Sequence, residues 1–344
     1  MIIRVGINGL GRIGRCVLRA LAEIEPAGIE VVAVNGPAPT DTHLHLLRYD
    51  SIHGPFHGTL SGGDDWLDVG HGKMRLFHER DPRAIPWEEA HVDVVLECTG
   101  KFRTHEQASL HLTRGVKKVL ISAPSPDADA TIVYGVNTHA LRHDHHIISV
   151  GSCTTNCLAP IAHVMQEAVG IQSGFMTTIH SYTGDQNLVD GSHKDPRRAR
   201  AAAMSMIPTS TGAAKALGQV LPQLQGKLHG TAVRVPTPNV SLVDFTFYAE
   251  RDTTAAKINQ LLRDAAEGTH HEVLSVCDAP LVSIDHNRSP YSAVVDAEET
   301  YVVNGRLCRI AAWYDNEWGF SRRMLDMARL CGTHMRGAAR RDNA

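Results

Sequence analysis

Runs of apolar, β-branched residues alternate with amphipathic stretches along the first 150 residues of the chain. The apolar runs predict strands at residues 2–8, 30–35, 92–98, 118–122 and 146–150, and the amphipathic stretches predict helices at residues 11–24, 40–48 and 105–114. Strands that are apolar throughout and separated by helices are typical of a parallel sheet with helices on both faces. We therefore expect a doubly wound α/β domain over residues 1–151.

The pattern changes after residue 151. Helices are predicted at residues 154–170 and 254–266, and strands at residues 174–181, 231–236, 241–250, 293–295 and 306–314. A long basic loop, residues 182–207, follows the first of these strands. Long strands with few helices indicate an α+β domain with a mostly antiparallel sheet, which we expect over residues 152–316.

Composition narrows the class of protein. The chain has 344 residues, 43% of them hydrophobic and 21% charged, as expected for two globular domains. Its net charge of −3 argues against nucleic-acid binding as a main role, despite a basic patch at residues 194–200. No apolar run reaches the roughly 18 residues that span a bilayer, and the first residues lack the apolar segment of a signal peptide. We expect a cytoplasmic protein with no membrane partner.

The cysteines and histidines do not form a metal-binding pattern. The seven cysteines are odd in number and include no CxxC pair, which argues against a disulfide framework and a zinc ribbon. The 21 histidines include close pairs at residues 43/45, 145/146 and 270/271, but no cysteine or carboxylate accompanies them in a ligand pattern. We expect no metal site.

Three glycines, Gly9, Gly11 and Gly14, form a G-x-G-x-x-G motif between the first predicted strand and the first predicted helix. In this position the first glycine permits a tight turn, the second lets the backbone approach a pyrophosphate, and the third lets the helix pack closely on the strand. The helix N-terminus adds partial positive charge. The motif therefore predicts that the first domain is a dinucleotide-binding (Rossmann) domain.

The end of the second predicted strand departs from this pattern, because it reads Asn35-Gly36 and has no carboxylate. A carboxylate here usually binds the ribose hydroxyls and repels the 2′-phosphate of NADP. One interpretation is that Asn35 binds the ribose and that Asp41 or another group compensates. The other, which we favour, is that the site accepts NADP as well as NAD because the repelling charge is missing.

A cysteine and a histidine in the second domain are candidates for catalysis. Cys153 follows a predicted strand and precedes an apolar helix, so we expect it at a helix N-terminus. There the helix dipole and unpaired amides favour the thiolate and lower the pKa of the thiol, which makes a competent nucleophile. Cys157, one turn later, is expected to be a packing residue. His180, near the end of the strand predicted at residues 174–181, is a candidate general acid/base.

Five motifs in this chain, taken in order, resemble the glyceraldehyde-3-phosphate dehydrogenase family. They are the glycine motif at residues 8–15, SCTTNCLAP at residues 152–160, HSYT at residues 180–183, STGAAK at residues 210–215 and WYDNEWG at residues 313–319. The resemblance extends from about residue 2 to residue 333. It implies an enzyme that oxidises glyceraldehyde 3-phosphate with NAD or NADP and inorganic phosphate, and that releases 1,3-bisphosphoglycerate.

The resemblance also implies roles for individual residues. Cys153 would attack the aldehyde carbon to form a hemithioacetal, and His180 would take the proton of the hemithioacetal as hydride leaves for the nicotinamide. A thioester results, which phosphate cleaves. Thr183 and Arg234 would hold the phosphate of the substrate. The attacking phosphate would be surrounded by a second group of residues: Ser152, Thr154, Arg198, Thr211 and Gly212.

For the cofactor, the resemblance adds further contacts to the glycine motif, Asn35 and Gly36. It implies that the pyrophosphate lies at Arg12 and Ile13, the two ribose regions at Arg80 and Ser122, and the nicotinamide carboxamide at Asn316. It also implies a helix at residues 317–333 that packs back on the first domain, and a homotetramer in which the loop at residues 182–207 lies against the cofactor of a neighbouring subunit.

Two departures from the family pattern bear on the cofactor. Members restricted to NAD usually have Asp at the position of Gly36 and a Leu-Pro or similar pair at the position of Gly191-Ser192, so both departures favour NADP. Two alternatives remain. The first, erythrose-4-phosphate dehydrogenase, is disfavoured by the two implied anion sites. The second, a protein that mainly binds RNA, is disfavoured by the Cys153/His180 pair and the near-neutral charge.

Overall fold

The computed structural model describes residues 2–24, 28–113 and 115–341, which divide into two compact units. The first unit comprises the chain up to Tyr134, the segment Thr138–Gly151 and the chain from Ser321 onward. The second comprises Gly135–Asn137 and Ser152–Phe320. Within the described ranges, no helix is both long and apolar enough to cross a membrane.

The first unit is built on a nine-stranded sheet in the order β10-β11-β9-β8-β1-β2-β7-β6-β5. Seven strands run parallel, namely β1 (Ile3–Asn8), β2 (Ile29–Asn35), β7 (Met74–Phe77), β8 (Val94–Glu97), β9 (Lys118–Ile121), β10 (Ala130–Thr131) and β11 (Ile147–Ser149). The helices between these strands are α1 (Arg12–Ala22), α2 (Thr40–Arg48) and α3 (His105–Ser109). The predicted doubly wound α/β fold is confirmed, and its strand order reverses between β1 and β8. Ligands of such sheets bind at this reversal, outside the carboxyl ends of the strands.

Two regions of the first unit differ from the sequence prediction. Residues 49–77 contain short strands that the apolar pattern did not indicate: β3 (Tyr49–Asp50), β4 (Gly54–Pro55), β5 (Ser61–Gly63), β6 (Trp66–Asp68) and β7. The helix predicted at residues 105–114 ends at Ser109, because His111 beyond it turns into the core and bonds to the buried Glu97. Residue 114 lies outside the described residues.

The second unit contains a seven-stranded sheet in the order β13-β14-β12-β15-β18-β17-β16. Its strands are β12 (Ile171–Ser181), β13 (Ile207–Ser210), β14 (Leu228–Val235), β15 (Ser241–Ala249), β16 (Leu274–Cys277), β17 (Ala293–Val303) and β18 (Leu307–Tyr314). Only the pairs β12/β14 and β16/β17 are parallel, so the mostly antiparallel sheet is confirmed.

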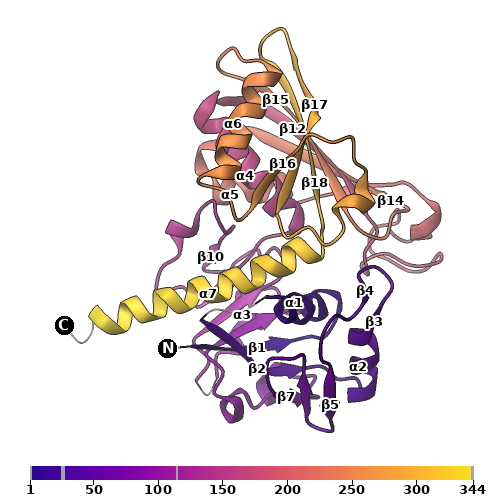
Figure 1. Ribbon diagram of the computed structural model, residues 1–344, viewed down its shortest axis with the longest axis vertical. Coiled ribbons are helices and arrows are strands. Elements are labelled where there is room, and N and C mark those ends of the chain that lie inside the picture. The colour runs from indigo at the N-terminus through magenta and orange to yellow at the C-terminus, as the bar shows by residue number, and fades with distance from the viewer. Residues whose placement is uncertain (1, 25–27, 114, 342–344) are drawn as a thin grey trace. The chain divides into compact units, whose positions relative to one another are not determined.

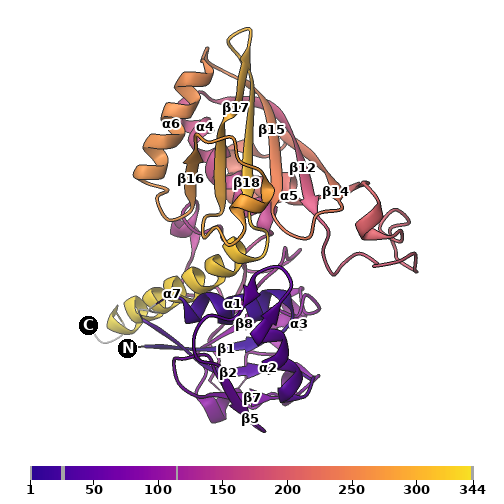
Figure 2. The same cartoon turned by 45° about the vertical axis from the view of Figure 1, so that its right-hand side comes forward.

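Helices cover one face of this sheet. They are α4 (Cys153–Ala168), α5 (Ala213–Val220) and α6 (Ala255–Glu267), and α4 contacts both of the others (Figures 1 and 2). The strands alternate accordingly, because successive side chains point to opposite faces. In β15, for example, Val243, Phe245 and Phe247 are buried, whereas Tyr248 is exposed.

The last helix, α7 (Trp318–Arg341), is longer than the helix predicted at residues 317–333. Alanine and arginine are good helix formers and no proline interrupts the segment, so the helix continues to Arg341. From Ser321 onward it belongs to the first unit, where Figure 1 shows it beside α1, and the Ser321 hydroxyl lies 3.5 Å from the carbonyl of Ile13. A Cβ atom on Gly332 would lie 2.1 Å from Cγ1 of Ile3, so only glycine permits this approach to β1.

Candidate active site

Cys153 and His180 are brought together in the second unit. Cys153 is the first residue of α4, and the preceding Ser152 caps the helix by accepting a 3.0 Å hydrogen bond from the amide of Thr155. His180 lies near the end of β12. The Sγ atom of Cys153 and the Nε2 atom of His180 are 3.6 Å apart. The two residues therefore form a thiol–imidazole pair, with a nucleophile and a base in contact.

The tautomer of His180 follows from its second contact. Its Nδ1 atom lies 2.7 Å from the carbonyl oxygen of Ser181, which can only accept, so Nδ1 carries the proton of the neutral ring. The Nε2 atom is then unprotonated and faces the thiol. Burial and the positive charges of Arg234 and Arg198 lower the pKa of His180 to about 3, so the imidazole is neutral and can accept a proton at pH 7.

The pKa of Cys153 does not follow the sequence prediction. Burial raises the pKa of this thiol by more than the charge of Arg234 and the hydrogen bonds from Thr154 lower it. The expectation that the helix N-terminus lowers the pKa is therefore wrong for the protein without ligands, because the cost of desolvating a thiolate exceeds the stabilisation. The pair rests as a neutral thiol and a neutral imidazole.

Tyr314, at the end of β18, packs against His180 of this pair. Its hydroxyl lies 2.8 Å from both the Thr154 and the Thr178 hydroxyls, and its ring packs edge-on against His180 with centroids 5.9 Å apart. The Thr154 hydroxyl is thus turned toward Tyr314 in the interior. From the sequence, Tyr314 was only one residue of the motif at residues 313–319 and had no predicted role. The sequence signal that could have identified this residue is a tyrosine at an inward-facing position near the end of a strand.

Arg234 and Thr183 lie close to His180 and bond to each other, so they place a positive charge and a hydroxyl beside the imidazole. Arg234 Nη1 donates to the carbonyl oxygen of Ser181 and to the hydroxyl of Thr183, each at 3.1 Å. Its Nε atom is buried and makes no hydrogen bond within the described residues. Burial and the charge of Arg198 lower the pKa of Arg234, so an anion bound here would be electrostatically favourable.

Arg198 comes from the long loop and has all three guanidinium nitrogens engaged. Nε donates to the Thr209 hydroxyl at 3.0 Å, Nη2 donates to the carbonyl of Ser210 at 3.2 Å, and Nη1 pairs with Asp185. Its charge reaches His180, but an anion that contacted its nitrogens would share them with Asp185.

Thr211 and Gly212 immediately precede α5. Gly212 is the N-cap of this helix, and the Thr211 hydroxyl accepts a 3.2 Å hydrogen bond from the amide of Ala213. A Cβ atom on Gly212 would have no neighbour within 4 Å, so the space beside this helix N-terminus is open. The amides at such an end are donors suited to an anion.

The Asn316 side chain is held in one orientation in the second unit. Its Oδ1 atom accepts hydrogen bonds from the Ser181 and Ser241 hydroxyls at 2.8 and 3.0 Å, and the residue is buried. This leaves the Nδ2 group as the donor that can bind a ligand. Neither serine was predicted as a site residue, because a hydroxyl that orients another side chain has no sequence signal of its own.

The glycine motif has the predicted geometry in the first unit. Gly9 has a φ of +98°, and a Cβ atom on Gly14 would lie 2.0 Å from the carbonyl oxygen of Gly9, so the turn and the helix contact both require glycine. A Cβ atom on Gly11, the N-cap of α1, would have no neighbour within 4 Å. The space above Gly11 therefore suits a pyrophosphate approaching the amides of Arg12 and Ile13.

Other predicted cofactor residues lie at the carboxyl ends of the strands or on α1. The Arg12 side chain forms a bidentate ion pair with Asp50, with distances of 2.6 and 3.2 Å. Burial would raise the pKa of Asp50, but hydrogen bonds from Arg12 and from the amides of His53 and Ile52 lower it below its usual value. The Ser122 amide, just after β9, donates to the Glu97 carbonyl at 3.0 Å, and Arg80 is exposed.

Asn35 and Gly36 lie at the end of β2. The Asn35 carboxamide bonds to Asn8 and to both the N–H and the C=O of Glu79, at 2.8 to 2.9 Å. Asn35 thus retains little capacity to bind a ribose through its side chain. A Cβ atom on Gly36 would lie 2.7 Å from Nε2 of the buried His43, so a larger residue here requires His43 to move.

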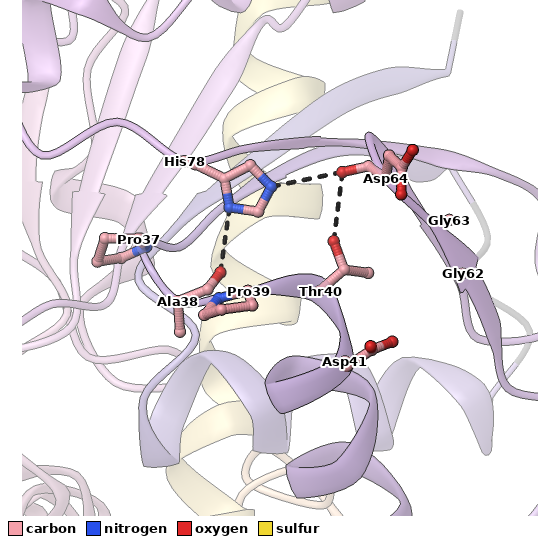
Figure 3. Close-up of a pocket in the computed structure, with 9 residues that line it drawn as sticks. All are labelled: Pro37, Ala38, Pro39, Thr40, Asp41, Gly62, Gly63, Asp64 and His78. Atoms are coloured by element: carbon pink, nitrogen blue, oxygen red, sulfur yellow. Dashed lines mark hydrogen bonds between the residues drawn. The ribbon is translucent and has the colours of Figure 1, made fainter.

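An open pocket of about 660 Å³ adjoins this strand end (Figure 3). It is lined by Pro37, Ala38, Pro39, Thr40, Asp41, Gly62, Gly63, Asp64 and His78. The Nδ1 atom of His78 lies 3.1 Å from the carbonyl of Ala38, and the Thr40 hydroxyl donates to the carbonyl of Asp64 at 3.3 Å. The pocket holds two carboxylates, Asp41 and Asp64, so negative charge is present near β2 although Gly36 supplies none.

Comparison with known proteins identifies the family. Residues 3–105 match the glyceraldehyde 3-phosphate dehydrogenase NAD binding domain, and residues 152–316 match the C-terminal domain of the same enzyme. Glyceraldehyde-3-phosphate dehydrogenase of Cereibacter sphaeroides is 55% identical over 332 residues, and that of Xanthobacter flavus 53%, each alignment covering 96% of this chain and 99% of the relative. The chromosomal enzyme of Cupriavidus necator is 54% identical over 330 residues, which cover 95% of this chain and 98% of the relative. With both domains matched in order, the chain belongs to the glyceraldehyde-3-phosphate dehydrogenase family.

Proposed function

We propose that the protein is a phosphorylating glyceraldehyde-3-phosphate dehydrogenase that uses NAD or NADP and inorganic phosphate. The observation that carries this proposal is the contact between the Cys153 thiol and the unprotonated Nε2 of His180, in a chain that belongs to this family. The relatives compared above all bear the name of this enzyme, so the erythrose-4-phosphate alternative is not favoured.

Cys153 acts as the nucleophile and His180 as the base. When Sγ bonds to the aldehyde carbon, the thiol proton passes to Nε2 of His180, which is neutral and faces it at 3.6 Å. NAD or NADP, when bound, supplies the acceptor for the hydride that the oxidation removes. A phosphate oxygen then bonds to the carbonyl carbon of the Cys153 thioester, the C–S bond breaks, and the departing sulfur takes back the proton held on Nε2 of His180.

Two groups of side chains suit the two phosphates. We assign the phosphate of the substrate to Arg234 and Thr183, because Arg234 has a buried Nε donor with no hydrogen bond within the described residues. We assign the attacking phosphate to the open N-terminus of α5 at Gly212, with Thr211, Ser152 and Arg198 around it. Thr154 would contribute through its backbone, because its hydroxyl faces Tyr314. Arg198 contributes mainly charge, since its nitrogens already have partners.

The first unit fits a dinucleotide. Gly9, Gly11, Gly14 and the amides of Arg12 and Ile13 would hold the pyrophosphate at the open end of α1. Gly36, the backbone of Asn35, Arg80 and Ser122 would contact the ribose regions, and Asn316 would donate to the nicotinamide carboxamide through Nδ2. The missing carboxylate at Gly36 leads us to propose that NADP is used as well as NAD.

We further propose a cytoplasmic homotetramer. The long loop exposes four large apolar side chains, Leu188, Val189, Met204 and Met206, each at least 71% exposed. Such a group on one loop is typical of a surface that a second subunit covers. The cytoplasm is proposed because all seven cysteines are free thiols, as is usual in a reducing compartment.

Steady-state kinetics test the enzymatic proposal. We expect oxidation of glyceraldehyde 3-phosphate that requires inorganic phosphate, and much weaker activity with erythrose 4-phosphate. The variant His180→Asn, which can keep a donor toward the Ser181 carbonyl, should lower kcat by about two to four orders of magnitude. Near-normal turnover in that variant, or phosphate-independent activity in the unmodified protein, would contradict the proposal.

A further inference from the structure

A network of buried polar side chains lies beneath the dinucleotide motif of the first unit. Its members come from four segments far apart in the sequence: Asn8 at the end of β1, Asn35 at the end of β2, Glu97 at the end of β8, and His111 after α3. None is more than 3% exposed. The catalytic pair does not use these residues, since Cys153 and His180 belong to the other unit.

Glu97 is the acceptor on which the network converges. Its Oε2 atom accepts from Asn8 Nδ2 at 2.6 Å and from His111 Nε2 at 3.0 Å. Its Oε1 atom accepts from the amide of Thr99 at 2.8 Å and from the Thr99 hydroxyl. Four donors around one carboxylate are what a buried anion requires.

The proton on His111 is fixed by Trp87. The indole Nε1 is a donor only, and it lies 3.2 Å from His111 Nδ1, so Nδ1 must accept. The ring proton is then on Nε2, where it is donated to Glu97. His111 is a neutral donor in this arrangement, and Glu97 carries the negative charge.

The donor-to-acceptor order of these hydrogen bonds continues from Glu97 to the end of β2. Because Asn8 donates to Glu97 through Nδ2, its Oδ1 atom is left to accept from Asn35 Nδ2 at 2.8 Å. Asn35 in turn donates to the carbonyl of Glu79 and accepts from its amide, each at 2.9 Å. One chain of oriented amides therefore runs from the loop after β7 to Glu97.

Each loop that the network fixes adjoins a proposed cofactor contact. Thr99 packs against Gly9, where an added Cβ would lie 2.8 Å from the amide nitrogen of Thr99. Glu79 directly precedes Arg80, and Asn35 directly precedes Gly36. The loops after β1, β2, β7 and β8 thus share one buried connection at the reversal of strand order.

We propose that Glu97, with Asn8, Asn35 and His111, positions these loops for the adenosine half of the dinucleotide and so sets cofactor affinity. The inference rests on the proposed function only in taking a dinucleotide as the ligand. Glu97 is a positioning residue, because it bonds to Thr99, Asn8 and His111, whereas the proposed cofactor contacts are Gly9, Gly36 and Arg80. It acts by holding the loops in one arrangement before binding, so that binding need not order them.

The variant Glu97→Gln tests this role. It keeps the shape of the side chain but replaces one acceptor oxygen by a donor, which must face the donors of Asn8 and His111 or of Thr99. We expect the Kd for NAD and for ADP-ribose, measured by isothermal titration calorimetry, to rise by about tenfold or more. The KM for glyceraldehyde 3-phosphate and the rate of Cys153 alkylation without cofactor should stay within about twofold, because those groups lie in the other unit.

A second pair of variants keeps the proposal testable if Glu97→Gln does not fold. Thr99→Val removes the hydroxyl that donates to Glu97 and should weaken ADP-ribose binding severalfold, whereas Thr99→Ser retains the hydroxyl and should bind nearly as the unmodified protein. Glu89→Gln, an exposed exchange in the same unit, is the matched control.

Two results would overturn the proposal. One is unchanged NAD and ADP-ribose affinity in Glu97→Gln and Thr99→Val. The other is a comparable loss in all three measurements, namely a higher Kd for the cofactor, a higher KM for the substrate and slower alkylation of Cys153, which would indicate general destabilisation. Failure of the proposed function is a separate outcome, since it would appear as an unmodified protein that binds NAD but does not oxidise the aldehyde.

Discussion

The charge state of Cys153 and His180 decides how the site starts its reaction. Burial raises the pKa of the thiol, and burial with the nearby arginines lowers the pKa of the imidazole to about 3. A neutral pair can transfer its proton at the moment of attack, when a bound anionic substrate offsets the charges of Arg234 and Arg198. The structure thus favours a thiolate that forms only when Cys153 attacks the substrate, rather than one that is present before the substrate binds.

This charge state gives a pH prediction. A thiol with a raised pKa is mostly neutral at pH 7, so alkylation of Cys153 by iodoacetamide should become faster as the pH rises above 7. Cys153 should still react ahead of Cys157, whose buried thiol has a pKa well above its usual value. In Arg234→Leu the profile should move to higher pH, because the charge that lowers the pKa of Cys153 is lost. Peptide mass spectrometry after timed labelling measures both effects.

The half-exposed Arg306, which pairs with Asp252, provides the control: Arg306→Leu should leave the labelling profile unchanged. Preferential labelling of Cys157, or an Arg234→Leu profile shifted to lower pH, would show that the assignment of the nucleophile or of its neighbouring charge is wrong.

A single residue, Gly36, also bears on the choice between NAD and NADP. We expect a kcat/KM with NADP at least comparable to that with NAD, because Gly36 supplies no charge against the 2′-phosphate. Gly36→Asp should shift the preference toward NAD by about tenfold or more relative to Gly36→Ala. The alanine variant is needed as the reference, since any Cβ here meets His43 at 2.7 Å.

The opposite result has a defined meaning. If the unmodified enzyme strongly prefers NAD and Gly36→Asp does not change this, the carboxylates of Asp41 and Asp64 in the neighbouring pocket become the candidates for the selecting charge. Asp41→Asn, measured in the same assay, would then be the next variant.

At the scale of elements, the caps and the apolar pattern explain most helix positions. The helix predicted at residues 40–48 matches α2 in full, and α4 begins one residue before its prediction because Ser152 caps it. Strand β17 was predicted only over residues 293–295, although it spans Ala293–Val303. The adjacent charged residues Glu298 and Glu299 interrupt the apolar run, and the pairing with β18 shifts register in this part of the strand.

The α6 helix permits a clean test of capping. Thr254 accepts a 3.2 Å hydrogen bond from the amide of Lys257 and lies outside the candidate site. Thr254→Ala should lower the free energy of unfolding by about 1 kcal/mol, as measured by urea denaturation, while Thr254→Ser should retain most of it. Kinetic constants should not change in either variant. An equal loss in both would mean that the methyl group, not the hydroxyl, provides the stabilisation.

The candidate site was predictable to a different degree from the elements. Cys153 and His180 are reactive residue types at strand and helix ends, and the sequence alone singled them out. Asn8 and Glu97 are 89 positions apart and meet only through strand pairing, so no local pattern could link them. Arg198 was predicted, but its partner Asp185 was not, because a loop without periodicity gives no indication of its internal contacts.

At the scale of the whole molecule, the uncovered face of the seven-stranded sheet is the main unexplained surface within the described residues. Strand register places five exposed apolar side chains on it: Phe175, Tyr248, Tyr301, Val303 and Leu307. A face with several large apolar groups is typical of subunit contacts, and it adds to the exposed apolar residues of the long loop.

Sedimentation velocity tests the proposed assembly. The unmodified protein should sediment as a species of four chains. Tyr301→Glu, which places a charge on the apolar face, should shift the distribution to smaller species, whereas Tyr301→Phe should not. A monomer at micromolar concentration would contradict the homotetramer, and an unchanged tetramer in Tyr301→Glu would exclude this face as a contact.

Because α7 belongs to the first unit from Ser321 onward, the first unit cannot be completed until the second has been synthesised. A ribosome releases the N-terminus first, yet β1 lacks its neighbour Gly332 until the whole second unit has been synthesised. The second unit is almost contiguous in sequence, so it can fold once Phe320 has emerged. The first unit is begun earlier but is left with part of its apolar surface uncovered until α7 has been made. In the nascent chain the second unit is therefore expected to fold completely before the first. A chain whose synthesis stops before Ser321 should depend on chaperones to remain soluble.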